Sequence, residues 1–272
     1  MNKLIFIDID GTIRDFDGYI PDSTIRAIRE TRIKGNKVFL CTGRPLSQID
    51  KEVLDIGVDG IVASSGSYIE IDGKIIDHTV FTKMTYLVLT TYLVEHDCAV
   101  QLQSYKDSYI LNSQQDYFDE LGEKLHDMFG GEKELVMPST VVESPMDVDE
   151  IEKMIFFSEE ISPERLKKKW GNDLNIVNLS IPVDATWAGE IGPKNINKAY
   201  GIEKVLESLG RDVKDTIAFG DSENDLEMIA FAHVGIAMGN AIEELKEIAD
   251  FVTRPIRNDG LHSAFRALGV ID

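Results

Sequence analysis

Asp8 and Asp10 are the first residues whose types and spacing could do chemistry. They follow the apolar run 4–7, which is typical of a strand buried on both faces. Because residues two apart on a strand project to the same side, we expect the two carboxylates to point together. Adjacent carboxylates repel unless a positive group lies between them, and Mg²⁺ is a cation that prefers oxygen ligands. The alternative is a strand end followed by an ordinary Asp-Gly turn.

Three further clusters supply groups that phosphoryl transfer requires. They are Thr42-Gly43-Arg44, Lys198, and the group of Asp221, Asn224 and Asp225. A carboxylate can attack phosphorus, and a nearby Asp can protonate the leaving oxygen and then deprotonate water. Mg²⁺ between Asp8 and Asp221 would shield a negative nucleophile from a negative substrate. Thr42 and Lys198 can donate hydrogen bonds to phosphoryl oxygens, whose charge must be neutralised.

The predicted elements place these clusters at one edge of a sheet. The strand–helix–strand order of residues 4–41 indicates a parallel sheet, whose ligands bind at the carboxyl ends of its strands. Between residues 82 and 190, paired strands alternate with amphipathic helices, which suggests a separate core. We therefore predict an α/β fold with a doubly wound, mostly parallel, Rossmann-like core formed by residues 1–81 and 191–272, and an inserted α+β unit at 82–190.

Composition excludes several classes of protein. The formal net charge of the 272 residues is -20, and such a chain would repel nucleic acid and anionic membranes. No stretch approaches the length of a membrane span. The chain has two cysteines, Cys41 and Cys98, which is no disulfide framework and fits a reducing compartment. We expect a cytoplasmic protein without a nucleic-acid or membrane partner; its oligomeric state is not readable from the sequence.

Together, the motifs resemble the haloacid dehalogenase (HAD) superfamily of phosphohydrolases, and within it the Cof-type subgroup. The superfamily signature Asp-x-Asp-x-Thr is matched by residues 8–12, and Thr42 matches the Ser or Thr that ends the second strand. Gly-Asp-x-x-Asn-Asp is matched by residues 220–225, and Ala-Met-Gly-Asn-Ala by residues 237–241. The resemblance covers the whole chain and is weakest in its middle. One departure is Ser65-Gly66-Ser67, where many relatives carry Asn-Gly-Ala, so a role for the side chain at position 65 stays open.

The resemblance implies a role for each motif residue. Asp8 would be the nucleophile and Asp10 the general acid/base. Mg²⁺ would be bound by the Asp8 carboxylate, the Asp10 main-chain carbonyl and Asp221. The phosphate would be held by Thr42, Gly43, Lys198 and Asn224, while Asp225 would orient Lys198 or a metal-bound water. Residues 82–190 would form a mobile cap that closes over the site and reads the leaving group.

The resulting hypothesis is a Mg²⁺-dependent phosphatase that acts on a small phosphorylated metabolite, a sugar phosphate or a phosphorylated cofactor, through an aspartyl-phosphate. Phosphomutase or phosphotransferase activity on the same core is one alternative, and a non-catalytic phosphate-binding regulatory protein is another. Two residues keep alternatives of their own. Arg44 could contact substrate or pair with a neighbouring acid. Lys194 competes with Lys198 for the phosphate-binding role, and the register of the family pattern favours Lys198.

Overall fold

The computed structural model describes residues 2–128, 139–179 and 186–272, with only the backbone described at 125–128. The chain divides into two compact units. The first comprises Met1–Arg44, Ile49–His78 and Asn197–Asp272, and the second comprises Pro45–Gln48 and Thr79–Ile196. The sequence placed residues 1–81 and 191–272 in one unit and 82–190 in the other, whereas here the second unit also takes in Pro45–Gln48 and extends over Thr79–Ile196. The role of the second unit as a substrate-reading cap stays a prediction.

The first unit is built on an eight-stranded sheet of order β14-β13-β12-β1-β2-β3-β4-β5, as far as the described residues show. The strands are β1 (Leu4–Ile7), β2 (Lys37–Cys41), β3 (Gly60–Ala63), β4 (Tyr68–Ile71), β5 (Lys74–His78), β12 (Thr216–Gly220), β13 (Val234–Ala237) and β14 (Phe251–Val252). Pairing is parallel from β14 to β3, and β4 and β5 are added antiparallel. The α/β class and the mostly parallel sheet predicted from the sequence are thus confirmed.

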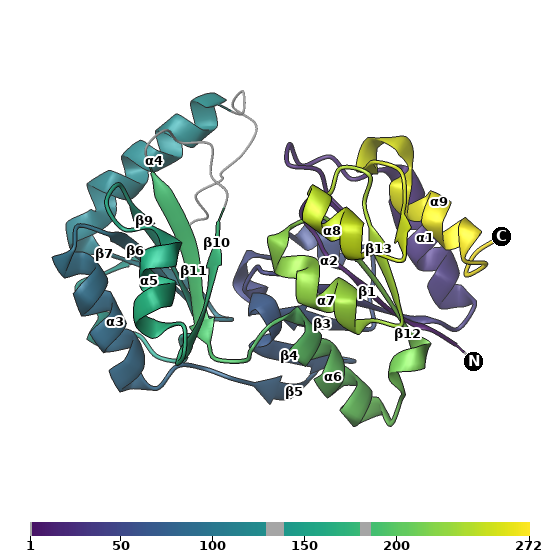
Figure 1. Cartoon of the computed structure of the whole chain (residues 1–272), viewed down its shortest axis with the longest axis horizontal. Helices are drawn as coiled ribbons and strands as arrows, with labels where there is room; N and C mark the ends of the chain where they lie inside the picture. The colour runs from purple at the N-terminus through teal and green to yellow at the C-terminus, as the bar shows by residue number, and fades with distance from the viewer. Residues whose placement is uncertain (1, 129–138, 180–185) are drawn as a thin grey trace. The chain divides into compact units, whose positions relative to one another are not determined.

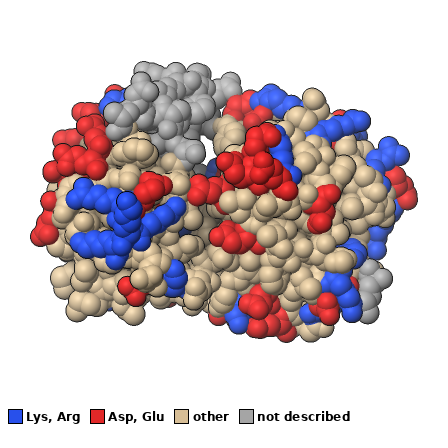
Figure 2. Space-filling view, in the orientation of Figure 1, with Lys and Arg blue, Asp and Glu red and all other residues tan. Residues whose placement is uncertain are grey.

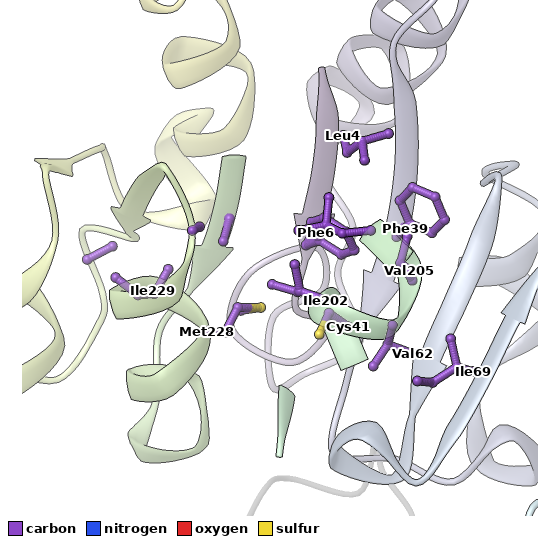
Figure 3. Packing of buried hydrophobic residues seen from close by; sticks show 14 of the residues in the cluster. Leu4, Phe6, Phe39, Cys41, Val62, Ile69, Ile202, Val205, Met228 and Ile229 are labelled. Atoms are coloured by element: carbon purple, nitrogen blue, oxygen red, sulfur yellow. The ribbon is translucent and has the colours of Figure 1, made fainter. Parts of the chain in front are cut away.

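Helices cover both faces of this sheet (Figure 1). They are α1 (Asp22–Ile33), α2 (Lys51–Leu54), α6 (Lys198–Leu209), α7 (Leu226–Phe231), α8 (Glu243–Ile248) and α9 (Gly260–Ala267). On one face, Ile202 and Val205 of α6 and Met228 of α7 pack against Phe6 and Phe39 (Figure 3). Successive residues of a strand point to opposite faces. The residues of β1 and β2 that alternate with Phe6 and Phe39 therefore point to the other face, where α1 packs against α9. A sheet buried on both faces explains why its strands are continuous apolar runs.

The second unit has its own sheet of order β10-β11-β9-β6-β7-β8. Its strands are β6 (Ala99–Gln103), β7 (Ser108–Leu111), β8 (Thr140–Val142), β9 (Lys153–Ser158), β10 (Leu174–Asn178) and β11 (Trp187–Pro193), and its helices are α3 (Lys83–Glu95), α4 (Gln115–Met128) and α5 (Pro163–Trp170). Pairing is antiparallel except between β7 and β8. Two apolar clusters form its core, one containing residues of α3 and α5 and the other Phe118 of α4. This is the α+β character that the sequence predicted.

Charge is unevenly distributed over the visible surface (Figure 2). Basic side chains gather over α5, which carries Arg165 and the run Lys167–Lys169. Acidic side chains are spread over both units (Figure 2). No helix among the described residues is long and apolar enough to cross a bilayer. The absence of a nucleic-acid partner stays a prediction.

Candidate active site

Three of the predicted site residues directly follow neighbouring strands of the first sheet. Asp8 follows β1, Thr42 follows β2 and Asp221 follows β12, and β1 pairs with both other strands. Because these strands run parallel, their carboxyl ends lie at the same edge of the sheet. The Asp8 N–H donates to the Phe219 carbonyl at 3.0 Å, which continues the ladder into the site. Asp8, Thr42 and Asp221 are all at most 5% exposed, so the sheet places a hydroxyl and two carboxylates in a buried position.

Lys198 links two of the acids. Helix α6 begins at this residue because Asn197 caps it, accepting a hydrogen bond from the Tyr200 N–H at 2.9 Å. The Lys198 ammonium donates to Asp8 Oδ1 at 2.7 Å and to Asp225 Oδ1 at 2.5 Å. Burial opposes its charge, but Asp225 and Asp8 outweigh that effect and raise the pKa of Lys198 above its usual value. The ammonium is therefore charged, and it fixes the direction of the Asp8 carboxylate.

Asp225 is occupied on both carboxylate oxygens. Its Oδ1 accepts from Lys198, while its Oδ2 accepts from the N–H groups of Asp221 at 2.9 Å and Ser222 at 3.1 Å. These bonds close the turn between β12 and α7. The geometry fits the predicted role for Asp225 of orienting Lys198, and that role stays a prediction.

Asp221 is held by contacts from the first motif. Thr12 Oγ1 donates to Asp221 Oδ1 at 2.9 Å. Gly11 lies so close that a Cβ built on it would be 2.1 Å from Asp221 Oδ2, and its φ is +86°. Glycine is therefore required at position 11 both by its backbone conformation and by the approach of Asp221. The loop after β1 thus positions a carboxylate more than two hundred residues away in the sequence.

The donor set fits a hard divalent cation. Asp8, Asp221 and Asp225 each offer an oxygen, and these oxygens lie within 4.8 Å of one another. Both oxygens of Asp225 already accept hydrogen bonds, whereas Asp8 and Asp221 accept the bonds described above on Oδ1, so Asp8 and Asp221 are the side chains that fit the cation. Burial raises the pKa of Asp8 to about 7, with Lys198 opposing the shift, and burial raises the pKa of Asp221 with Asp8 adding to it. Without a cation, these two buried acids favour the protonated form. A bound cation would favour their charged form instead.

Asp10 lies apart from this group and pairs with Arg44. Arg44 Nε donates to Asp10 Oδ2 at 2.6 Å, Nη2 donates to Oδ1 at 2.7 Å, and Nη1 donates to Asp50 Oδ2 at 3.2 Å. Asp50 also pairs with Arg14. From the sequence, Arg44 could either contact substrate or pair with a neighbouring acid. The structure shows that it pairs with Asp10. A contact between Arg44 and substrate stays a prediction.

The remaining predicted phosphate-binding residues lie in the turns after β2 and β12. Gly43 is the partly buried residue between Thr42 and Arg44. The Ser222 hydroxyl donates to Asn224 Oδ1 at 3.0 Å. Lys194, the alternative to Lys198, donates to the Gly171 carbonyl within the second unit. The structure thus brings Asp8, Lys198, Asp221 and Asp225 together, and the phosphate-binding roles stay predictions.

A group of polar side chains on one face of the second sheet was not predicted from the sequence. Gln103 Nε2 donates to Gln101 Oε1 at 2.7 Å, while Gln103 Oε1 has no hydrogen-bond partner within the described part of the chain. On the neighbouring β9, Lys153 forms an ion pair with Glu190 at 3.1 Å. Gln101 and Gln103 alternate with apolar residues along β6, and that alternation in a buried strand is the signal that could have revealed them.

A model of the haloacid dehalogenase-like hydrolase family matches residues 5–265. The chain belongs to this family. It is thus an enzyme of the hydrolase class, as the motifs predicted. "Putative phosphatase YkrA" of Bacillus subtilis is 29% identical over 283 aligned residues, which cover 99% of each chain. The B. subtilis 5-amino-6-(5-phospho-D-ribitylamino)uracil phosphatase YcsE is 28% identical over 266 residues, covering 97% of this chain and 94% of that protein.

A solved structure agrees with this membership. The HAD subclass IIB sugar phosphatase BT4131 superposes with a TM-score of 0.82 and 25% identity, covering 99% of this chain and 100% of that one. The fold is therefore that of HAD phosphatases over essentially the full length.

Proposed function

We propose that the protein is a Mg²⁺-dependent phosphatase that hydrolyses a small phosphorylated metabolite through a covalent aspartyl-phosphate on Asp8. The observation that carries the proposal is the buried Lys198 ammonium between Asp8 and Asp225, beside Asp221. This arrangement provides a carboxylate of fixed direction, a fixed positive charge and a pair of acids suited to a cation. Family membership and the phosphatase names of two relatives support it.

The predicted cation ligands are Asp8, Asp221 and the Asp10 carbonyl. When bound, Mg²⁺ would neutralise charge on the nucleophile and on the transferring phosphoryl group. Lys198 holds Asp8 in position and adds a second positive charge. Thr42 donates to a phosphoryl oxygen, and Asn224 and Gly43 complete the phosphate contacts.

The reaction then proceeds in two displacements. In the first, an Asp8 carboxylate oxygen forms a bond to phosphorus, the bond from phosphorus to the leaving oxygen breaks, and Asp10 gives its proton to that oxygen. In the second, Asp10 takes a proton from water as the water oxygen attacks phosphorus, and the Asp8–phosphorus bond breaks. Asp10 is suited to this role because its carboxylate is only partly buried, with 28% of the side chain exposed.

A hydroxylated substrate, such as a sugar phosphate, suits the second unit best. In this proposal the second unit reads the leaving group, and one face of its sheet carries the side chains of Gln101, Gln103, Lys153 and Glu190. The glutamines are neutral, and the charges of Lys153 and Glu190 balance, so this face favours neutral groups that both donate and accept hydrogen bonds. Hydroxyl groups have that property. Gln103 Oε1, which has no hydrogen-bond partner among the described residues, can accept a hydrogen bond from one of them.

The decisive experiment combines turnover with trapping of the intermediate. Release of inorganic phosphate from an aryl phosphate and from a panel of sugar and polyol phosphates is measured with Mg²⁺ and with EDTA. Acid quenching during turnover of a ³²P-labelled substrate should leave label on the wild-type protein and none on Asp8→Asn. Asp212→Asn, an exposed acid that caps the turn Val213–Asp215, is the control substitution.

Three results would contradict the proposal. They are phosphate release that is unaffected by EDTA, full activity of Asp8→Asn, and label that is trapped equally in both proteins. Transfer of the label to a second sugar in place of water would instead identify a phosphotransferase.

A further inference from the structure

The turn after β3 is strained at two successive residues. Ser64 has φ 48° and Ser65 has φ 53°, both in the left-handed region. A residue with a Cβ is strained there because the Cβ approaches the backbone carbonyl oxygen, and neither residue is glycine. Such strain persists only where surrounding contacts over-determine the backbone, and it concentrates at functional sites.

The contacts that hold this turn come from the candidate active site. The Ser64 N–H donates to the Arg44 carbonyl at 2.8 Å, and the Ser65 N–H donates to the Thr42 carbonyl at 2.9 Å. On the other side, a Cβ at Gly66 would lie 2.3 Å from the carbonyl oxygen of Asn197, the residue before Lys198. The turn is therefore fixed between the segment that carries Thr42 and the start of α6.

The Ser65 hydroxyl has no hydrogen-bond partner among the described residues. Its oxygen is buried and forms no hydrogen bond with any described residue. Leaving a buried hydroxyl unpaired destabilises the fold, because the group loses its hydrogen bonds to water, and glycine at this position would avoid both that cost and the backbone strain. A serine here is therefore explained by a group that the hydroxyl binds.

The position of the turn in the sheet indicates which group that is. Asp8, Thr42 and the Ser65 turn follow β1, β2 and β3, which are successive neighbours. Strands are spaced by about 4.8 Å, so Thr42 is one spacing from Asp8 and the Ser65 turn about two, or roughly 10 Å. A phosphoryl group at Asp8 reaches donors about 3 Å from its oxygens, which suits Thr42. The Ser65 turn is too far from Asp8 for such a contact, so a substrate group that binds the Ser65 hydroxyl would belong to the leaving group and not to the phosphoryl group.

We propose that Ser65 is a specificity-determining residue whose hydroxyl binds a hydroxyl group of the leaving group. A serine hydroxyl both donates and accepts, so it matches another hydroxyl. The first unit, and not only the second, then selects hydroxylated substrates. This inference rests on the proposed phosphatase function.

The test compares three substitutions at one position. Ser65→Gly removes the hydroxyl and relieves the strain, Ser65→Ala removes the hydroxyl and keeps the strain, and Ser65→Asn supplies an amide donor in a residue that tolerates the left-handed region. The readout is the preference, as the ratio of kcat/KM values, for the best polyol or sugar phosphate of the wild type over propyl phosphate. Inhibition by inorganic phosphate is measured in parallel.

We expect Ser65→Gly and Ser65→Ala to lower the preference about tenfold, in line with one lost hydrogen bond, while inhibition by phosphate changes less than twofold. Ser65→Asn should restore part of the preference. Ser65→Gly should also unfold at a higher temperature than the wild type, which separates the loss of preference from misfolding.

An unchanged preference in Ser65→Gly would overturn the inference, because the hydroxyl would then bind nothing more than water. Weaker inhibition by phosphate in that variant would also overturn it, since the hydroxyl would belong to the phosphate site. A wild-type protein that hydrolyses no phosphomonoester would instead contradict the proposed function.

Discussion

Arg44 holds both carboxylate oxygens of Asp10, through Nε at 2.6 Å and Nη2 at 2.7 Å. A bidentate pair of this kind fixes the plane of the carboxylate as well as its position. Asp50 accepts from Nη1 of the same guanidinium and anchors Arg44 from the other side. In the proposed mechanism, Asp10 must give up one of these bonds when it takes up the proton that it delivers, so we expect Arg44 to act as a positioning residue for Asp10.

Replacement of Arg44 by Lys should impair proton delivery. Lysine keeps the charge but cannot form the two parallel bonds. We expect kcat/KM for alkyl phosphates to fall about 10–100-fold, within the range that general acid catalysis contributes. The fall should be much smaller for aryl phosphates, whose leaving group needs less help from an acid. Parallel measurement of kcat/KM on both substrate classes checks this.

A matched control is available in the same unit. Arg32 forms a bidentate pair with Asp59, through Nε at 2.9 Å and Nη2 at 3.1 Å. Arg32→Lys breaks an equivalent pair without touching the candidate site residues, so both substrates should be hydrolysed at wild-type rates. Equal losses on alkyl and aryl phosphates in Arg44→Lys would show that Arg44 acts on substrate binding and not through Asp10.

Lys198→Met should strongly destabilise the fold. The substitution leaves the carboxylates of Asp8 and Asp225 buried without the cation that both contact. Breaking a buried ion pair in this way costs about 3–5 kcal/mol, which urea unfolding of the metal-free protein measures. The double variant Lys198→Met, Asp225→Asn should be no less stable than Lys198→Met, because it also removes one of the unpaired charges. Additive losses would mean that the two residues are energetically independent.

The sequence was sufficient to predict those parts of the site that follow from local pattern. Asp8, Thr42 and Asp221 each come directly after a continuous apolar run, and a parallel sheet brings such positions to one edge. The first residue of α6 does not follow from local pattern in the same way: the helix begins at Lys198 because the capping bond of Asn197 decides its first turn.

Contacts between distant residues could not be predicted. The sequence offered two partners for Arg44 with equal weight, and only the fold places the guanidinium 2.6 Å from Asp10. The left-handed conformation of Ser65 is equally unreadable, because serine has little intrinsic preference for that region and the turn is held by the Thr42 and Arg44 carbonyls. Tertiary hydrogen bonds override local propensity at such positions.

The stability of the metal-free protein should depend on the protonation of Asp8. Burial raises the pKa of Asp8 from 3.8 to about 7 in the folded state. Between about pH 4 and pH 7 the folded protein therefore holds a proton that the unfolded chain has released. This contribution is fully present below pH 4 and is lost as the pH rises through 7, with a slope of up to about 1.4 kcal/mol per pH unit.

Urea unfolding from pH 4.5 to 8 in EDTA, compared between the wild type and Asp8→Asn, isolates this dependence. The wild type should lose stability relative to the variant as the pH rises, and saturating Mg²⁺ should abolish the trend because it favours the charged carboxylate. Mg²⁺ binding at pH 6 should release protons, which calorimetry in buffers of different ionisation enthalpy detects. Parallel pH profiles for the two metal-free proteins would refute the assignment.

Gly11→Ala should weaken the cation site while leaving most of the fold intact. Position 11 has φ +86°, and the new methyl group would meet Asp221 Oδ2. Gly73→Ala is the matched control, since Gly73 has φ +74° with no described atom within 4 Å of the added Cβ. Both variants should lose roughly 1–2 kcal/mol of stability from the left-handed backbone. Only Gly11→Ala should also weaken Mg²⁺ binding, about 10–100-fold, as misplacing a ligand does. Calorimetric titration with Mg²⁺ distinguishes the two variants, and equal affinities would show that Gly11 does not position Asp221 for the cation.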